Sequence, residues 1–153
     1  MKKSIEIKSR ILKQMDDMLK VRIDDAMQTI ASAMESRNND TKSSAGDKFE
    51  TGREMIQMEI NNNEIQLNKA HILQQELSKI DLHKISEKIE PGSLVITNHE
   101  NYFISVAMGK IMVDDQTYYA ISLASPIGLL LSGKRKGDQV SFQNRTLEIQ
   151  ELY

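Results

Sequence analysis

Two long segments of the chain carry hydrophobic residues at the spacing of an α-helix. In the first segment, these residues follow one another at steps of three, four or seven, with Lys, Asp, Glu, Arg and Gln between them. That period predicts a single hydrophobic stripe along one helix. The predicted stripe consists of Ile5, Leu12, Met15, Leu19, Ile23, Met27, Ile30 and Met34.

The second segment repeats the pattern. Both stripes are narrow, as in the contact line of a coiled coil, so we expect the two helices to pair antiparallel. Some 30 to 35 residues per helix predict a rod on the order of 45 to 50 Å long. Similar stripes also pair between chains, which leaves a dimer open. The second stripe consists of Ile56, Ile60, Asn63, Leu67, Ala70, Leu73, Leu77 and Ile80.

The stretch 43–53, between the two segments, contains Gly46 and Gly52 and predicts the turn of the helical hairpin. It also carries Asp47 and Glu50, three residues apart at the expected start of the second helix. One interpretation is a capping box, with Asp47 as the N-cap. The other is a pair of exposed carboxylates for a hard cation such as magnesium, which one or two carboxylates hold together with water and phosphate oxygens.

The pattern changes after Ile80. Residues 81–92 read as a linker that ends in Pro91 and Gly92, and short β-type segments follow. Ser125 and Pro126 predict the start of a short hydrophobic helix. We therefore expect an α+β protein with a helical hairpin at 1–80 and a small antiparallel sheet domain with one short helix at 93–153. The expected strands are 94–97, 102–106, 118–123, 140–142 and 147–149.

Composition narrows the function classes. The chain has no Cys, which excludes disulfides, thiolate zinc sites and cysteine nucleophiles. Its net charge of −2 argues against autonomous binding to DNA or RNA. The start of the chain does not read as a signal peptide, and hydrophobic runs such as Leu129-Leu130-Leu131 are far too short for a membrane span. We expect a cytoplasmic protein without membrane contact.

Nearly the whole chain resembles the bacterial transcript cleavage factors GreA and GreB and their paralogues that bind the secondary channel of RNA polymerase. Ser125-Pro126-Ile127-Gly128, with the later Gly133-Lys134 and Gly137-Asp138, is similar to the most specific motif of that family. Gly46-Asp47-Lys48-Phe49-Glu50 is similar to its Gly-Asp-x-x-Glu tip. The family continues with Asn and Ala-Glu-Tyr where this chain has Thr51 and 52–54, and it often has Arg at Leu129. The resemblance implies an FKBP-like sheet domain.

The resemblance also implies a mechanism. The sheet domain would bind RNA polymerase through Ser125, Pro126 and Ile127, and the hairpin tip would enter the secondary channel. There Asp47 and Glu50 would be the catalytic carboxylates and help hold a second magnesium next to the 3′ end of backtracked nascent RNA. Lys48 and Arg53 are candidates for contacts to RNA phosphates. The cofactor is expected only in the polymerase complex, and no independent nuclease activity is expected.

Two alternatives remain. A regulator could occupy the same channel without supporting cleavage, and the altered residues after Glu50 favour this class. A prolyl isomerase is suggested only by the FKBP-like sheet, and a fold-level analogy says little about function. The low aromatic content of 5% also argues against a proline pocket.

Overall fold

The computed structural model describes residues 2–40 and 46–153, and for residues 40 and 46–49 it describes the backbone only. The chain falls into two compact units. We call residues 17–74 the hairpin unit and residues 1–16 together with 75–153 the sheet unit. Long helices precede a sheet with a short helix, so the predicted α+β class is confirmed. The domain boundaries expected at residues 80 and 92 stay predictions.

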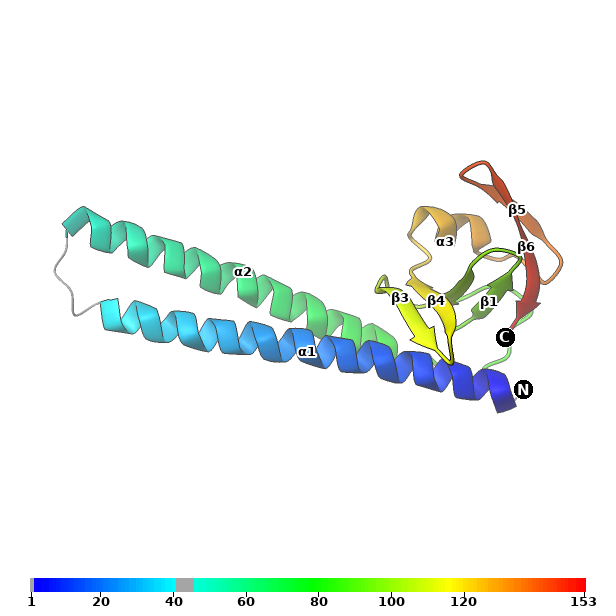
Figure 1. Cartoon of the computed structure of the whole chain (residues 1–153), viewed down its shortest axis with the longest axis horizontal. Coiled ribbons are helices and arrows are strands. Elements are labelled where there is room, and N and C mark those ends of the chain that lie inside the picture. The colour runs from blue at the N-terminus through cyan, green and yellow to red at the C-terminus, as the bar shows by residue number, and fades with distance from the viewer. Residues whose placement is uncertain (1, 41–45) are drawn as a thin grey trace. The chain divides into compact units, whose positions relative to one another are not determined.

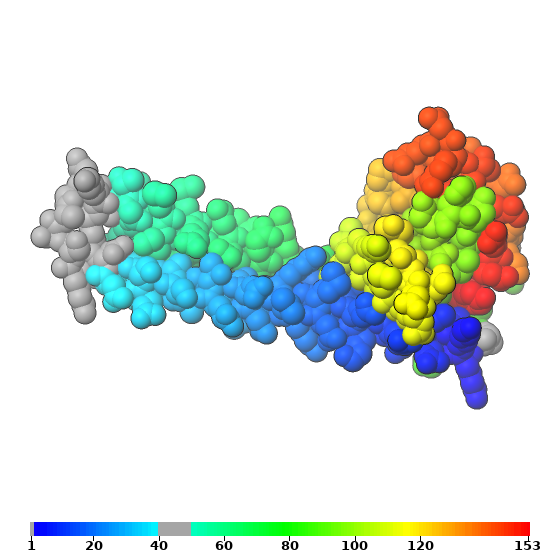
Figure 2. Space-filling model, viewed as in Figure 1, coloured from blue at the N-terminus to red at the C-terminus, as the bar shows by residue number. Residues whose placement is uncertain are grey.

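Two helices form the hairpin unit. α1 spans Lys2–Asp40 and α2 spans Gly46–Ser78, and their parts within this unit run antiparallel (Figure 1). Neither helix contains Pro, so every interior backbone N–H can bond to the carbonyl four residues earlier. In Figure 2 the cyan and green side chains of the two helices meet along the unit.

The hydrophobic stripe predicted for α2 is confirmed. Seven of its eight positions lie in α2 and are buried or half-buried, and the eighth, Ile80, is half-buried just after the helix ends at Ser78. Ile60 and Ala70 are only 1% and 4% exposed. Asn63 is half-buried and donates a hydrogen bond from Nδ2 to the carbonyl oxygen of Glu59, 2.9 Å away in the same helix. Its amide is therefore satisfied within α2.

The stripe predicted for α1 is wrong at two positions of the hairpin unit. Met27 and Met34 are 54% and 36% exposed, whereas Ala26 and Ala33 are 6% exposed each. A helical stripe advances by three or four residues, and both steps keep it on one face. After Ile23 the buried line takes the shorter step, since alanine lets two helix backbones approach more closely than methionine does.

The sheet unit is built on a six-stranded sheet in the order β3-β4-β2-β1-β6-β5. Two tight turns connect β1 to β2 and β5 to β6 in antiparallel hairpins. The second of them has Gln143 and Asn144 at φ 52° and 62°, as a tight hairpin turn requires. The strands are β1 Leu94–Thr97, β2 Asn101–Ile104, β3 Gly109–Val113, β4 Gln116–Ile121, β5 Gln139–Phe142 and β6 Arg145–Leu152.

The sheet is mixed, whereas the sequence predicted an antiparallel one. β2 and β4 pair in parallel, with Phe103 opposite Ala120, and the other four pairs are antiparallel. The parallel pair arises because β3 lies between these two strands in the sequence and pairs with β4 at the edge of the sheet. Strand β3 was not predicted. It lies at the edge of the sheet, and its alternate residues Lys110 and Met112 are exposed.

The short helix α3, Pro126–Leu131, closes the core of the sheet unit. Ile127 and Leu131 are 8% and 0% exposed. They join a cluster of side chains from the sheet and from the chain before it. The other buried members of this cluster are Ile89, Val95, Tyr102, Ile104, Val140, Leu147 and Ile149.

The first turns of α1 belong to the sheet unit and bind the β3-β4 hairpin. Gln14 Nε2 donates a hydrogen bond to the carbonyl oxygen of Met112 at 2.6 Å, and Arg10 forms an ion pair with Asp114 in the turn. Met15 is fully buried, and Ser105 Oγ lies 3.9 Å from its sulfur. Among the described residues, no helix has the length and hydrophobicity needed to cross a membrane.

Candidate functional site

The predicted catalytic carboxylates lie at the start of α2. This helix begins at Gly46, so Asp47 and Glu50 are one turn apart along its first residues. The Glu50 side chain is exposed. The side chains of Asp47 and Lys48 lie outside the described residues, and the capping interpretation and the metal interpretation both depend on the first of them.

A pocket of about 330 Å³ next to this turn brings predicted and unpredicted residues together. Glu50 and Arg53 line it from α2, and Arg37 lines it from the end of α1. Arg37 Nη1 donates a hydrogen bond to Gln57 Oε1 at 2.7 Å, and Gln57 Nε2 donates to Asn61 Oδ1 at 3.0 Å. Glu54 also lines it, so two arginines and two glutamates share one space at this end of the hairpin unit.

Arg37 was missed in the sequence. It is half-buried and lies four residues after Ala33, so it continues the buried line of α1. The signal for it was an arginine on the stripe within the last turn of the first helix. Because the stripe was extended through Met34 instead of Ala33, that position was not recognised.

The predicted polymerase-binding residues do not form one surface. Ser125 is the N-cap of α3: its Oγ accepts a hydrogen bond from the N–H of Gly128 at 3.0 Å and donates to the carbonyl oxygen of Ser122 at 2.7 Å. Ile127 points into the core of the sheet unit. Pro126 is exposed. Of the three, only Pro126 offers an exposed side chain.

Two further hydrophobic side chains of α3 face solvent. Leu129 is 67% exposed and Leu130 is 39% exposed. They follow Pro126 by three and four residues, a spacing that puts all three on one side of the helix. This spacing was present in the sequence. It was not used, because the helix was predicted from its start signals Ser125 and Pro126.

The segment 134–136 after α3 is basic, and two of its residues form ion pairs. Arg135 Nη1 lies 3.6 Å from a carboxylate oxygen of Glu87, and Lys136 Nζ lies 3.0 Å from one of Glu151. These pairs are largely exposed and stabilise the fold little. They do lower the positive charge that this turn presents to a partner.

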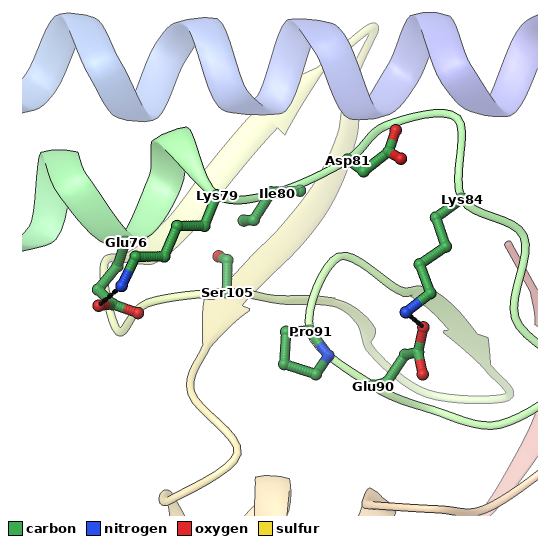
Figure 3. Close-up of a pocket in the computed structure, with 8 residues that line it drawn as sticks. All are labelled: Glu76, Lys79, Ile80, Asp81, Lys84, Glu90, Pro91 and Ser105. Carbon is green, nitrogen blue, oxygen red and sulfur yellow. Dashed lines mark hydrogen bonds and ion pairs between the residues drawn. The ribbon is translucent and has the colours of Figure 1, made fainter.

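A larger cavity of about 530 Å³ lies in the sheet unit, and none of the predicted site residues lines it (Figure 3). Four of its charged side chains form two ion pairs, and Asp81 also lines the cavity. Lys79 Nζ is 3.0 Å from Glu76 Oε1, and Lys84 Nζ is 2.8 Å from Glu90 Oε1. The hydrogen bond from Lys84 holds the pKa of Glu90 below its usual value. Asp81 accepts a hydrogen bond from the backbone N–H of His83, so the charges of this cavity all have partners within the chain.

A further ion pair, between Arg145 and Glu100, connects two turns of the sheet. Arg145 Nη1 and Nη2 donate to the two carboxylate oxygens of Glu100 at 2.8 and 3.1 Å. This hydrogen bonding holds the pKa of Glu100 below its usual value. Burial, followed by the charge of Glu100, raises the pKa of the neighbouring Tyr102 to about 12. The group stabilises the β1-β2 turn.

No cluster of three or more His, Asp or Glu side chains able to hold a metal ion occurs in the part of the chain that the structure describes. The side chain of Asp47 lies outside that part.

Comparison with known proteins gives little beyond the fold description. No family model and no curated protein matches the chain. One solved structure, described as "Structure of the transcription factor Gfh1", aligns with 90% of this chain and 92% of its own length, at 18% identity and a TM-score of 0.35. We base no argument on a similarity of this level.

Proposed function

We propose that this protein is a transcription factor of the GreA and GreB type that binds RNA polymerase and stimulates cleavage of backtracked RNA. In this proposal the hairpin unit enters the secondary channel, and the sheet unit binds the polymerase surface. The protein is an accessory to the polymerase active site and has no nuclease activity of its own.

The observation that carries the proposal is the chemistry of the turn end of the hairpin unit. There the exposed carboxylate of Glu50 shares a pocket with Arg37 and Arg53. RNA cleavage at a phosphodiester needs carboxylates for a metal ion and positive charge for the phosphate. Both kinds of group are present on a helical hairpin whose sequence resembles the family's tip.

The donor set fits magnesium. Asp47 and Glu50 are hard oxygen donors one turn apart, and magnesium in proteins takes one or two carboxylates and completes its shell with water and phosphate oxygens. When bound, magnesium supplies a more acidic water and positive charge at the phosphodiester. The chain's own part is to bring the two carboxylates to the polymerase and to face the RNA phosphate with Arg53 and Lys48.

Docking of the sheet unit is proposed through the exposed side of α3. Pro126, Leu129 and Leu130 provide hydrophobic contact area, while Ser125 and Ile127 hold the helix in place from inside the sheet unit. This assignment keeps the predicted segment and changes which of its side chains contact the polymerase.

A regulator that occupies the channel without cleavage is the second candidate, and Gly52 favours it. This glycine lies inside α2, two residues after Glu50, where the resembled family has another residue type. Glycine in a helix interior costs about 1 kcal/mol relative to alanine. A less stable first turn of α2 would allow the tip to rearrange. It suits a regulator more than a cleavage factor, which must hold two carboxylates in fixed positions.

The deciding experiment is RNA cleavage in backtracked elongation complexes assembled with RNA polymerase from the source bacterium. Wild-type protein is compared with the Asp47→Asn/Glu50→Gln double variant, which keeps side-chain size and removes both charges. We expect shortened RNA with wild-type protein only, and equal polymerase binding by both. Glu64→Gln, an exposed change farther along α2, is the matched control and should cleave like wild type.

Two results would redirect the proposal. If neither protein cleaves RNA although both bind polymerase, the non-cleaving regulator replaces the cleavage factor. If wild-type protein does not bind polymerase at all, both candidates are excluded.

A further inference from the structure

Lys8 is a buried lysine on the first turns of α1, in the sheet unit. Its residue is only 3% exposed, less than Ser4 one turn earlier. Ile11 and Met15, which continue the same side of the helix, are fully buried. Lys8 therefore occupies a position on a hydrophobic stripe, where lysine is seldom found without a paired charge.

The Lys8 ammonium has no close acidic partner. No carboxylate lies within ion-pair distance of it in the described part of the chain. The charge of Asp81 acts on it from farther away and raises its pKa, but burial outweighs this and lowers the pKa of Lys8 from its usual value. Asp81 Oδ1 already accepts a hydrogen bond from the N–H of His83 at 2.9 Å.

Another cation of this region, Lys84, already has an anionic partner. Lys84 carries an ion pair with Glu90, and Figure 3 shows its side chain turned toward that carboxylate. The carboxylates of this region thus have partners of their own. A buried ammonium without a counter-charge is costly, because the interior replaces little of its lost hydration.

Lys8 lines a cavity of about 220 Å³ whose wall contains no acidic side chain. Its polar lining residues are Ser4, Lys8 and Lys84, and the remaining lining is mainly hydrophobic. The cavity is smaller than the roughly 300 Å³ at which sites for drug-sized molecules begin. The other lining residues are Ile5, Leu82, Ile85, Leu152 and Tyr153, and the main-chain oxygen of Tyr153 accepts a hydrogen bond from the N–H of Leu94.

We propose that this cavity binds a small monocarboxylate with a hydrocarbon body. The carboxylate pairs with the Lys8 ammonium and supplies the missing counter-charge, and the hydrocarbon contacts the side chains of Ile5, Leu82 and Leu152. An inorganic anion such as phosphate satisfies only the first of these conditions. The inference is independent of the proposed function, since none of the residues assigned to cleavage or polymerase binding lines this cavity.

The test is a titration of the full-length chain followed by NMR of the lysine Cε–Hε groups. The probes are 4-methylpentanoate, its uncharged amide and inorganic phosphate. We expect 4-methylpentanoate alone to shift the Lys8 signal in a saturable way and to raise the pKa of Lys8. Affinity should fall as the pH rises through that pKa, because only the protonated amine pairs with the carboxylate. The other charged groups near Lys8 are Asp81 and Lys84.

Lys8→Met separates a binding role from a structural one. It keeps the length of the side chain and removes the charge, so the variant should fold at least as stably as wild type. It should bind the carboxylate about tenfold to a hundredfold more weakly, the usual range for a lost charge-assisted hydrogen bond. Lys3→Met, at an exposed position on the same helix, is the control and should bind like wild type.

Three results would overturn the proposal. The first is the absence of any saturable shift at Lys8 with the carboxylate. The second is equal carboxylate binding by the Lys8→Met variant and wild type. The third is binding of phosphate or of the amide as tight as that of the carboxylate, which removes the proposed ligand class.

Discussion

Arg37 near the end of α1 donates a hydrogen bond to Gln57 of α2, and the two side chains join the helices at the turn end of the hairpin unit. Their atoms Nη1 and Oε1 are 2.7 Å apart. Gln57 in turn donates to Asn61, so the contact continues along α2. This arrangement lies beside Glu50 and Arg53, which line the same pocket as Arg37.

Replacement of Arg37 should loosen this end of the hairpin. We expect Arg37→Met to lower the stability of the turn end by about 1 kcal/mol, the usual net value of such a hydrogen bond. Amide hydrogen exchange over residues 50–60 should speed up, and RNA cleavage should fall if the proposed function holds. Arg22→Met, at an exposed position of α1, is the control. Unchanged exchange in the Arg37 variant would mean that the hydrogen bond does not order the start of α2.

A new charge should lower the stability of the fold strongly at one position of α3 and very little at another, two residues away. Ile127→Asp places an unpaired carboxylate in the core of the sheet unit and should cost about 3 kcal/mol or more, visible as a large drop in melting temperature. Leu129→Asp changes a side chain that is 67% exposed and should alter stability by less than about 0.5 kcal/mol.

The Leu129 variant therefore tests docking without disturbing the fold. A pull-down with RNA polymerase should show weaker binding of Leu129→Asp than of wild type. The exposed Met112 on β3, in the sheet unit, offers a matched control, Met112→Asp, outside the docking surface. Equal polymerase binding by the Leu129 variant and wild type would show that this side of α3 is not the docking surface.

Two glycines should behave differently when replaced by alanine. A Cβ at Gly128 would overlap the carbonyl oxygen of Ser122, so Gly128→Ala must displace α3 and destabilise the sheet unit. A Cβ at Gly52 meets no atom within 4 Å, and Gly52→Ala should stabilise α2 by about 0.5 to 1 kcal/mol. Chemical denaturation of both variants checks these directions. A stabilising Gly128→Ala would contradict the close approach seen in the structure.

The ion pair of Glu100 and Arg145 should make stability depend on pH. The pKa of Glu100 is lowered in the folded state, so the pair stabilises the fold above the ordinary pKa of about 4.5. The contribution is lost as pH falls below that value and through the lowered pKa. We expect Arg145→Met to destabilise the protein by about 1 kcal/mol at pH 7 and by much less at pH 2.

Urea denaturation of wild type and Arg145→Met at the two pH values measures this difference. Lys136→Met, which breaks the more exposed pair with Glu151, serves as the comparison and should have a smaller effect at pH 7. A difference between wild type and Arg145→Met that is the same at both pH values would mean that Glu100 does not lose its partner on protonation.

The sequence by itself determined the features that depend on local order. The α2 stripe from Ile56 to Ile80 follows from the helical period, and every one of its positions is at least half-buried. The start of α3 follows from Ser125 and Pro126, because a side-chain acceptor and a fixed φ suit the first helical turn.

Tertiary structure decided what local order leaves open. A step of three or four keeps a residue on the same side of a helix, so only the packing of α2 against α1 selects Ala26 and Ala33 over Met27 and Met34. Strand β3 forms at the edge of the sheet because its backbone pairs with that of β4. Ile127 and Leu129 look alike in the sequence, but only the first is in the core. The pocket at Arg37 and the cavity at Lys8 both need segments far apart in the chain, and their proximity arises only when burial of distant side chains brings those segments together.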